Sequence, residues 1–144
     1  MRPLNNKIKF ELLPEDEQPK KTSMVPFGDA LKKVKVLEVG TKVEDIEKDD
    51  ILVLYNHDVM LFEGSMGYCL DRDPVFINDH PQKNKTHIQP KKSDRISKFE
   101  KGIILSTTDD QMITGDEIGF KKGNGLILPD NTEIISDTQI YFKS

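Results

Sequence analysis

The sequence has little of what several large protein classes require. Its 144 residues contain no Trp and a single cysteine, Cys69, so no intramolecular disulfide can form, which fits a reducing compartment. No run approaches the roughly 18 apolar residues that a membrane-spanning helix needs, and residues 1–7 lack the apolar core of a signal peptide. We therefore expect a cytoplasmic protein that does not interact with membranes.

Apolar residues and excess positive charge are also scarce. Hydrophobic residues make up 35% of the chain and charged residues 32%, too little apolar material for one deep core of this length. Small β units, long polar loops or an oligomer fit this composition better. The net charge of −4 argues against a dedicated nucleic-acid binder, which normally carries a basic surface.

Helical periodicity is nearly absent, and short β-like runs bounded by turn residues take its place. Such a pattern is typical of a small barrel or sandwich, so the sequence predicts an all-β fold. The expected strands are residues 7–13, 33–39, 51–55, 59–63, 68–70 and 75–77 in the first part, and residues 102–106, 117–121, 125–128, 132–135 and 139–142 in the second.

Two segments interrupt this pattern. Residues 14–33 are polar and rich in breakers, and a loop of that length is usually functional or disordered. Residues 80–98 contain Pro81, Pro90 and several basic residues, which predicts a linker. The expected domains are a β-barrel over residues 1–79 with its long loop at 14–33, the linker at 80–98, and a second, shorter β unit over residues 99–144.

The two β parts show an internal repeat when the chain is shifted by 67 residues. In both, a β-run leads through a polar stretch and an Ile to an acidic turn and the next strand. The shift predicts a partial tandem duplication, although any two hairpin regions could share such spacing. It equates Val36 with Ile103, Leu37 with Ile104, Ile46 with Ile113, Asp49 with Asp116, Ile51 with Ile118, and Val53 with Phe120.

The order of motifs carries a family resemblance. The chain opens with Arg2-Pro3-Leu4-Asn5-Asn6-Lys7-Ile8, continues through the long loop into Lys35-Val36-Leu37-Glu38-Val39-Gly40, and reaches a strand at residues 43–54. The later motifs are clearer in the second half, as Ile113-Thr114-Gly115-Asp116-Glu117-Ile118-Gly119-Phe120 and then Asn131-Thr132-Glu133-Ile134-Ile135-Ser136-Asp137. In this order the chain resembles the GroES-type co-chaperonin (chaperonin-10) family.

The resemblance covers most of residues 1–79 and 101–144. It departs from the family where Lys48-Asp49 replaces the usual Gly-Asp, and the second half shows no convincing opening strand or mobile loop. The resemblance implies GroES-like small β-barrels, a homo-oligomeric ring that is sevenfold by analogy, and a GroEL-type chaperonin ring as partner that encloses a substrate protein. It implies no enzymatic activity and no cofactor. The divergence is compatible with a bacteriophage-encoded member, whose location would be the host cytoplasm.

The long loop contains one apolar patch within its polar sequence: Met24, Val25, Pro26 and Phe27. In the family, an apolar tripeptide of the mobile loop docks into a groove on the chaperonin, so these residues are the candidate partner-binding site. Alternatively, the patch folds back and caps a barrel end. Gly102-Ile103-Ile104-Leu105 also resembles the docking tripeptide, but the repeat makes it a buried strand.

Catalytic and metal-binding patterns are weak. His57, His80 and His87 lack the close spacing of metal ligands and are expected to be solvated turn or linker residues. Cys69 is expected to be a buried, inert thiol. Three acidic clusters lack EF-hand spacing and coincide with expected turns, so a divalent cation is not the favoured interpretation. They are Asp49-Asp50, Asp71-Arg72-Asp73 and Asp109-Asp110.

The sequence therefore predicts a binding protein with no catalytic or metal site. The alternative function is a virion-associated or other structural β-barrel protein that acts through subunit contacts. A small-barrel enzyme or ligand binder is the third class.

Overall fold

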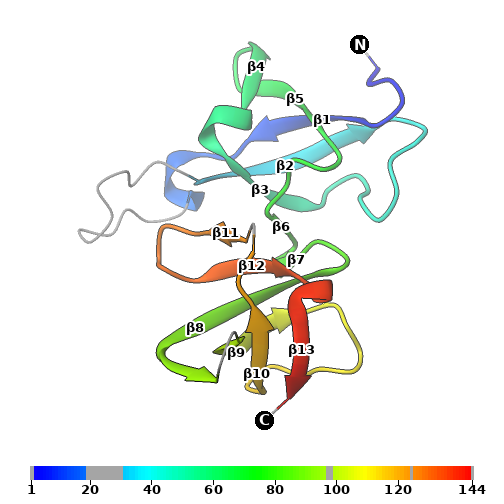
Figure 1. The fold of residues 1–144 in the computed structure, drawn as a ribbon. Coiled ribbons are helices and arrows are strands. Elements are labelled where there is room, and N and C mark those ends of the chain that lie inside the picture. The colour runs from blue at the N-terminus through cyan, green and yellow to red at the C-terminus, as the bar shows by residue number, and fades with distance from the viewer. Residues whose placement is uncertain (1, 19–30, 97–98, 124, 144) are drawn as a thin grey trace. The chain divides into compact units, whose positions relative to one another are not determined.

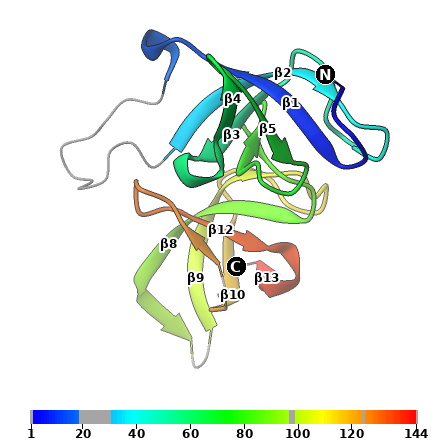
Figure 2. The same ribbon diagram turned by 90° about the horizontal axis from the view of Figure 1, so that it is seen from above.

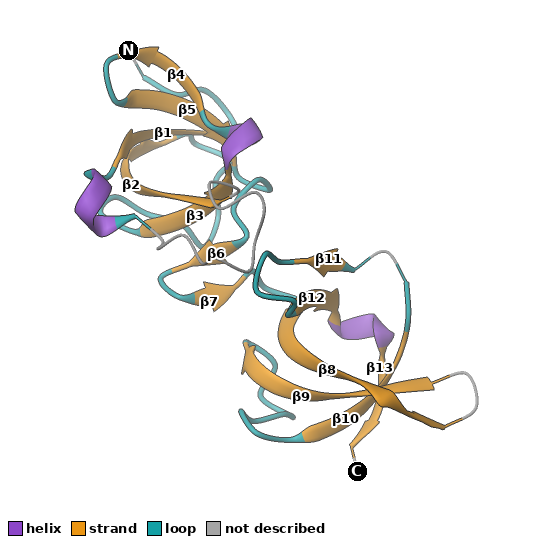
Figure 3. Cartoon of the chain, turned by 90° about the vertical axis from the view of Figure 1, so that its left-hand side faces the viewer, coloured by secondary structure: helices purple, strands orange, loops and turns teal. Residues whose placement is uncertain are grey.

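The computed structural model describes residues 2–18, 31–96, 99–123 and 125–143, and between residues 92 and 96 it describes the backbone alone. The chain divides into two compact units, Met1–Asp79 and His80–Ser144 (Figure 1). Strands dominate both units, and the helical segments of the described residues are three short 3-10 turns (Figure 3). The all-β prediction is confirmed.

The first unit is a six-stranded antiparallel arrangement in the order β4-β5-β1-β2-β3-β6. Two 3-10 turns, η1 (Glu15–Glu17) and η2 (Asn56–Asp58), lie in its connections. Its strands are β1 (Lys7–Leu12), β2 (Leu31–Val39), β3 (Ile51–Tyr55), β4 (Met60–Glu63), β5 (Met66–Leu70) and β6 (Phe76–Ile77).

The second unit has its own six-stranded antiparallel sheet, in the order β11-β12-β8-β9-β10-β13. A short strand, β7 (His80–Pro81), precedes it, and the 3-10 turn η3 (Asp137–Gln139) leads into its last strand. The sheet's strands are β8 (Lys85–Ile96), β9 (Phe99–Thr107), β10 (Glu117–Lys121), β11 (Leu126–Ile127), β12 (Glu133–Ser136) and β13 (Ile140–Lys143). β8 and β9 run side by side along most of their length (Figure 2).

Each unit has its own core, formed by alternate residues of its strands as the period of a half-buried strand requires. In the first unit the core includes Ile8 and Phe10 of β1, which are fully buried and packed with residues of β2, β3 and β5. In the second unit Ile88 of β8 and Phe120 of β10 have the same role. Two small cores, rather than one deep one, are what the low apolar content allows.

The two units share one topology. Each strand of the first unit has a counterpart at the same place in the second sheet, with β4, β5, β1, β2, β3 and β6 corresponding to β11, β12, β8, β9, β10 and β13. The bulges also coincide. The register of β1 with β2 shifts between Lys9 and Phe10, and that of β8 with β9 shifts between His87 and Ile88.

Matching hydrogen bonds outside the strands strengthen this correspondence. The Asp71 N–H donates to the Asn6 carbonyl, and the Asp137 N–H donates to the Asn84 carbonyl, both at 3.0 Å. The Leu70 N–H donates to the Asp73 carboxylate at 2.9 Å, and in the second unit the Ser136 N–H donates to the Gln139 side-chain oxygen at 3.0 Å. A shared sheet order, bulge and turn contacts are the structural marks of an internal duplication.

The single 67-residue shift is wrong in detail, because the structure requires three offsets. Val36 corresponds to Ile104, not Ile103, since Val36 pairs with Phe10 and Ile104 pairs with the equivalent Ile88. The offset is thus 68 for β2 and 78 for β1, whereas β3 follows an offset of 66, with Leu52 opposite Val34 and Ile118 opposite Gly102. A one-residue error exchanges the two faces of a strand, so the 67-residue shift matched buried residues with half-buried ones.

The linker predicted at 80–98 is also wrong. Residues 85–96 form β8, the longest strand of the chain, and they supply the opening strand that the second half lacked in the sequence. β8 pairs with β12 only from Lys85 to Ile88, so Pro90 lies where β9 is its one strand neighbour. Proline is tolerated at such edge positions because no ladder hydrogen bond is lost there.

The predicted closed barrel is not what the strand pairing shows. Within the described residues the order of each sheet is linear, and β4 and β11 are edge strands with one neighbour each. The structure therefore supports an all-β fold with two open antiparallel sheets.

Candidate docking site

The two copies differ most in the connection between their first two strands. In the second unit β8 ends at Ile96 and β9 begins at Phe99, whereas in the first unit β1 ends at Leu12 and β2 begins only at Leu31. The predicted partner-binding residues Met24, Val25, Pro26 and Phe27 belong to this insertion and lie outside the described residues. Comparison of the two units thus identifies residues 13–30 as a stretch of the first unit that the shorter connection of the second does not match.

The base of the insertion begins as a short acidic 3-10 turn. In η1 the residues Glu15, Asp16 and Glu17 are all exposed, and the Glu17 N–H donates to the Pro14 carbonyl at 2.9 Å. The turn ends when the Gln18 N–H donates to the Glu15 carbonyl at 3.2 Å. This turn carries the chain back toward the end of β1, where the Gln18 side chain meets the backbone of both strands.

Gln18 connects the two ends of the insertion. Its side-chain amide donates to the carbonyls of Leu13 at 2.7 Å and Lys33 at 3.0 Å, and its oxygen accepts from the Lys33 N–H at 2.7 Å. The Leu13 N–H also donates to the Lys33 carbonyl at 3.2 Å. Sequence reasoning missed Gln18, because a glutamine in a polar, breaker-rich run carries no periodic signal.

The edge strands expose apolar side chains at equivalent positions. In β4, Met60 is 64% exposed and Leu61 is 47% exposed. Their counterparts in β11, opposite the equivalent residues of the next strand, are Leu126 and Ile127, which are also exposed. The exposure is therefore a feature of both copies.

One residue of each expected acidic cluster, namely Asp50, Asp73 and Asp109, accepts a backbone hydrogen bond at a turn. The carboxylate of Asp50 accepts from the Glu47 N–H at 2.9 Å, and its counterpart Asp116 accepts from the Ile113 N–H at 3.0 Å. Within the described residues no group of three or more His, Cys, Asp or Glu side chains is placed to hold a metal ion.

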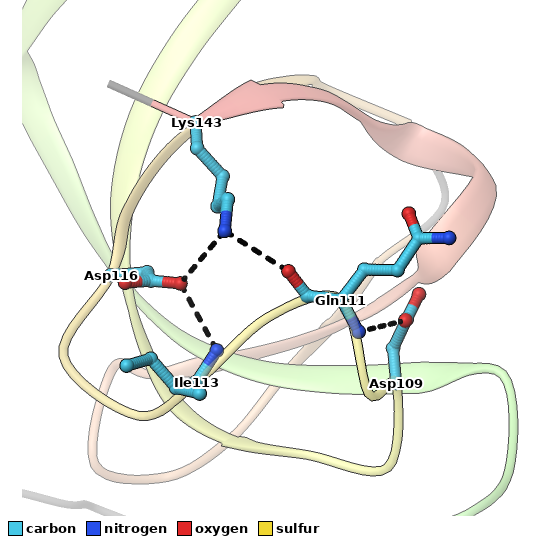
Figure 4. A network of polar contacts seen from close by, with 5 residues as sticks. All are labelled: Asp109, Gln111, Ile113, Asp116 and Lys143. Atoms are coloured by element: carbon cyan, nitrogen blue, oxygen red, sulfur yellow. Dashed lines mark hydrogen bonds and ion pairs between the residues drawn. The ribbon is translucent and has the colours of Figure 1, made fainter.

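The Asp116 turn belongs to a wider polar network in the second unit (Figure 4). The Lys143 ammonium lies 3.7 Å from the Asp116 carboxylate and donates to the Gln111 carbonyl at 3.0 Å. Asp109 accepts from the Gln111 N–H at 2.9 Å. Next to this network is an open cavity of about 260 Å³, lined in part by Tyr141 and Phe142. Because Asp50 makes the same turn contact in the first unit, the contact of Asp116 with the Ile113 N–H is accounted for by the fold.

The histidines lie apart from one another, and one differs from expectation. His57 and His80 are exposed, but His87 is a half-buried residue of β8 whose Nε2 lies 2.6 Å from the Thr132 hydroxyl. That hydroxyl donates to Asp130 at 2.5 Å, so the ring nitrogen must be the donor to Thr132. Burial lowers the pKa of His87, and the nearby Asp130 carboxylate opposes that shift. The expectation of a solvated linker histidine is wrong for His87.

Cys69 is a buried thiol, as predicted. It is 2% exposed in β5, within the core of the first unit. Burial, followed by the negative charges of Asp73, Asp58 and Asp71, raises its pKa to about 12. A thiol held in this protonated form is a poor nucleophile.

Gly102-Ile103-Ile104-Leu105 lies within β9, as the strand interpretation requires. Ile104 is fully buried, and Gly102 pairs with Ile118 of β10 and with Pro90 of β8. This segment is therefore part of the sheet, which leaves the insertion of the first unit as the candidate docking element.

Comparison with known proteins does not assign the chain to a family. It matches no protein-family model, and no curated protein is close enough in sequence to count as a relative. Within the described residues no helix has the length and apolar character needed to cross a membrane.

Proposed function

We propose that the chain is a divergent GroES-type co-chaperonin, built from two related antiparallel β units in tandem, of which the first carries a docking loop. The observation that carries the proposal is the insertion between β1 and β2, present in one of two otherwise matching units. The order of the family motifs along the sequence agrees with this reading. The chain would assemble into a homo-oligomeric ring that caps a chaperonin and encloses a substrate protein.

The apolar patch Met24, Val25, Pro26 and Phe27 would make the contact with the chaperonin. In the family that the chain resembles, a mobile loop that becomes ordered on docking binds weakly for the apolar area it buries, which permits release in each cycle. A ring of identical loops recovers affinity by binding many sites at once. The chain itself has no enzymatic activity in this proposal, since ATP is hydrolysed by the chaperonin.

The test is capture of a GroEL-type chaperonin with and without ATP. We expect the double variant Val25→Ser, Phe27→Ser to reduce ATP-dependent co-migration at least tenfold, because burying a Val or Phe side chain contributes about 1.5–3 kcal/mol. Ile113→Ser is the matched control, since Ile113 is an exposed apolar residue of the second unit (68%). It should bind like the wild type.

Two outcomes would contradict the proposal. One is a double variant that still co-migrates with the chaperonin like the wild type. The other is a monomer or trimer in solution that binds viral particles in place of a chaperonin. That result would favour the virion structural protein, whereas a closed ring supports the co-chaperonin.

A further inference from the structure

Gln18 occupies the position of a missing rung in the β1–β2 ladder. The last regular pair of that ladder is Leu12 with Val34. One residue further, the Lys33 N–H does not reach the Leu13 carbonyl directly. It donates to the Gln18 side-chain oxygen at 2.7 Å, while the Gln18 side-chain nitrogen donates to the Leu13 carbonyl at 2.7 Å. The amide is thus inserted between the two backbones and bonds to both.

The orientation of this amide follows from its partners. Its nitrogen faces two carbonyl oxygens, of Leu13 and Lys33, and its oxygen faces the Lys33 N–H. The reverse orientation would place oxygen against oxygen, so the geometry admits one assignment. Gln18 is half-buried at this point, which shields the bonds in part from competing water.

The second unit shows what the hairpin does without an insertion. There the ladder continues past the equivalent pair, Pro90 with Gly102, to Lys91 with Lys101 and on to Ile96 with Phe99. Backbone pairing continues there to the end of both strands. In the first unit the chain departs after Leu12, and the Gln18 amide and the Leu13–Lys33 hydrogen bond take over that function.

We propose that Gln18 is a positioning residue that ties both ends of the insertion and so fixes where residues 19–30 leave the first unit. The part of this inference that concerns docking to a partner rests on the proposed function. A chain segment whose two ends are held at fixed points loses less conformational entropy when it binds a partner than one whose ends are free. Gln18 therefore acts on docking without contacting the partner.

The first readout needs no partner. In Gln18→Ala, hydrogen exchange of the Lys33 amide should accelerate about fivefold, the equivalent of one net hydrogen bond. Gln18→Glu places an oxygen against the carbonyls of Leu13 and Lys33 where the amide has its donors, so it should protect Lys33 no better than Gln18→Ala does. Gln89→Ala, which removes an exposed glutamine of β8, is the control and should leave the Lys33 amide unchanged. If the exchange rate of the Lys33 amide is unchanged in Gln18→Ala, Gln18 does not tie the two ends of the insertion.

The second readout is capture of a GroEL-type chaperonin with ATP. Gln18→Ala should weaken capture at least fivefold, because avidity multiplies the loss at each loop, while its circular dichroism and melting midpoint stay close to those of Gln89→Ala. Capture equal to that of the wild type would overturn the positioning role even if Lys33 exchange accelerates. If the wild type itself is not captured, both the proposed function and the effect of Gln18 on docking are contradicted. The exchange rate of the Lys33 amide then still tests whether Gln18 ties the two ends of the insertion.

Discussion

Cys69 shows how burial and charge decide the reactivity of one residue. Its thiol lies in the core of the first unit, and its pKa is raised to about 12 by burial and then by the carboxylates of Asp73, Asp58 and Asp71. Only the thiolate reacts with alkylating reagents. Iodoacetamide at pH 8 should therefore modify the folded chain at least tenfold more slowly than the chain in denaturant, as mass spectrometry would measure. Equal rates would mean that Cys69 is accessible in the folded protein.

His87 makes the stability of the second unit depend on pH. Because burial lowers its pKa in the folded chain, the unfolded chain binds the proton more readily. The stabilisation is fully present above the ordinary histidine pKa of about 6.5 and decreases as the pH falls through the window between that value and the lower folded-state pKa. Urea midpoints between pH 8 and pH 5 should fall accordingly.

Two histidine variants distinguish the contribution of His87 to this pH dependence from that of other titrating groups. His87→Gln keeps a donor for Thr132 but does not titrate, so it should flatten the decrease between pH 7 and pH 5. His57→Gln, at an exposed position, should leave the decrease as it is in the wild type. A decrease of equal size in His87→Gln would assign the pH dependence to another group.

At the scale of elements, Gly67 allows the edge strand β4 to pair closely with β5. A Cβ at this position would lie 2.3 Å from the Met60 carbonyl oxygen and 2.8 Å from the Phe10 ring. The bulge of β4 between Leu61 and Glu63 lies next to this contact. Because the nearest atom belongs to the backbone, β4 has to move to admit a side chain.

Gly67→Ala should therefore destabilise the first unit by about 1–3 kcal/mol, the usual range for overpacking. Gly102→Ala is the matched strand glycine of the second unit, where the nearest atoms are 3.2 Å away. It should be clearly milder in a urea titration followed by circular dichroism. Equal effects of the two substitutions would show that β4 is not held as described.

Most strands could be predicted from the sequence, because short alternating runs and turn residues are local signals. β3 and β10 occur at the predicted bounds, Ile51–Tyr55 and Glu117–Lys121. β8 could not be predicted in this way. Pro81 precedes this strand and Pro90 lies within it, and together with its many charged residues they indicate a linker. The segment is a strand because it pairs with β9, and that tertiary contact cannot be seen in a local sequence pattern.

The candidate site was predictable in part. The apolar patch of residues 24–27 is visible in the sequence because its surroundings are polar, but the role of Gln18 depends on two carbonyls brought together by strand pairing. The repeat was visible as well. The register of the repeat could not be predicted, because the connection from β2 to β3 is two residues longer than that from β9 to β10. A single shift of 67 residues therefore fits neither β2 nor β3.

At the scale of the whole molecule, the shared topology of the two units gives the protein an internal control. Both units keep the sheet order, the bulge after the first residues of the opening strand, and the carboxylate-capped turn before the third strand. The largest difference among the connections is the one between the first two strands. A function that resides in the insertion should therefore be lost when the first unit is given the connection of the second.

The most direct test of the account is that exchange. Residues 13–33 are replaced by the sequence of residues 91–101, since both segments start from equivalent pairs, Leu12 with Val34 and Pro90 with Gly102. The variant should keep its circular dichroism spectrum and solution mass but no longer co-migrate with a GroEL-type chaperonin in the presence of ATP. A variant that folds and still co-migrates like the wild type would contradict the assignment of docking to the insertion, and with it the proposed co-chaperonin function.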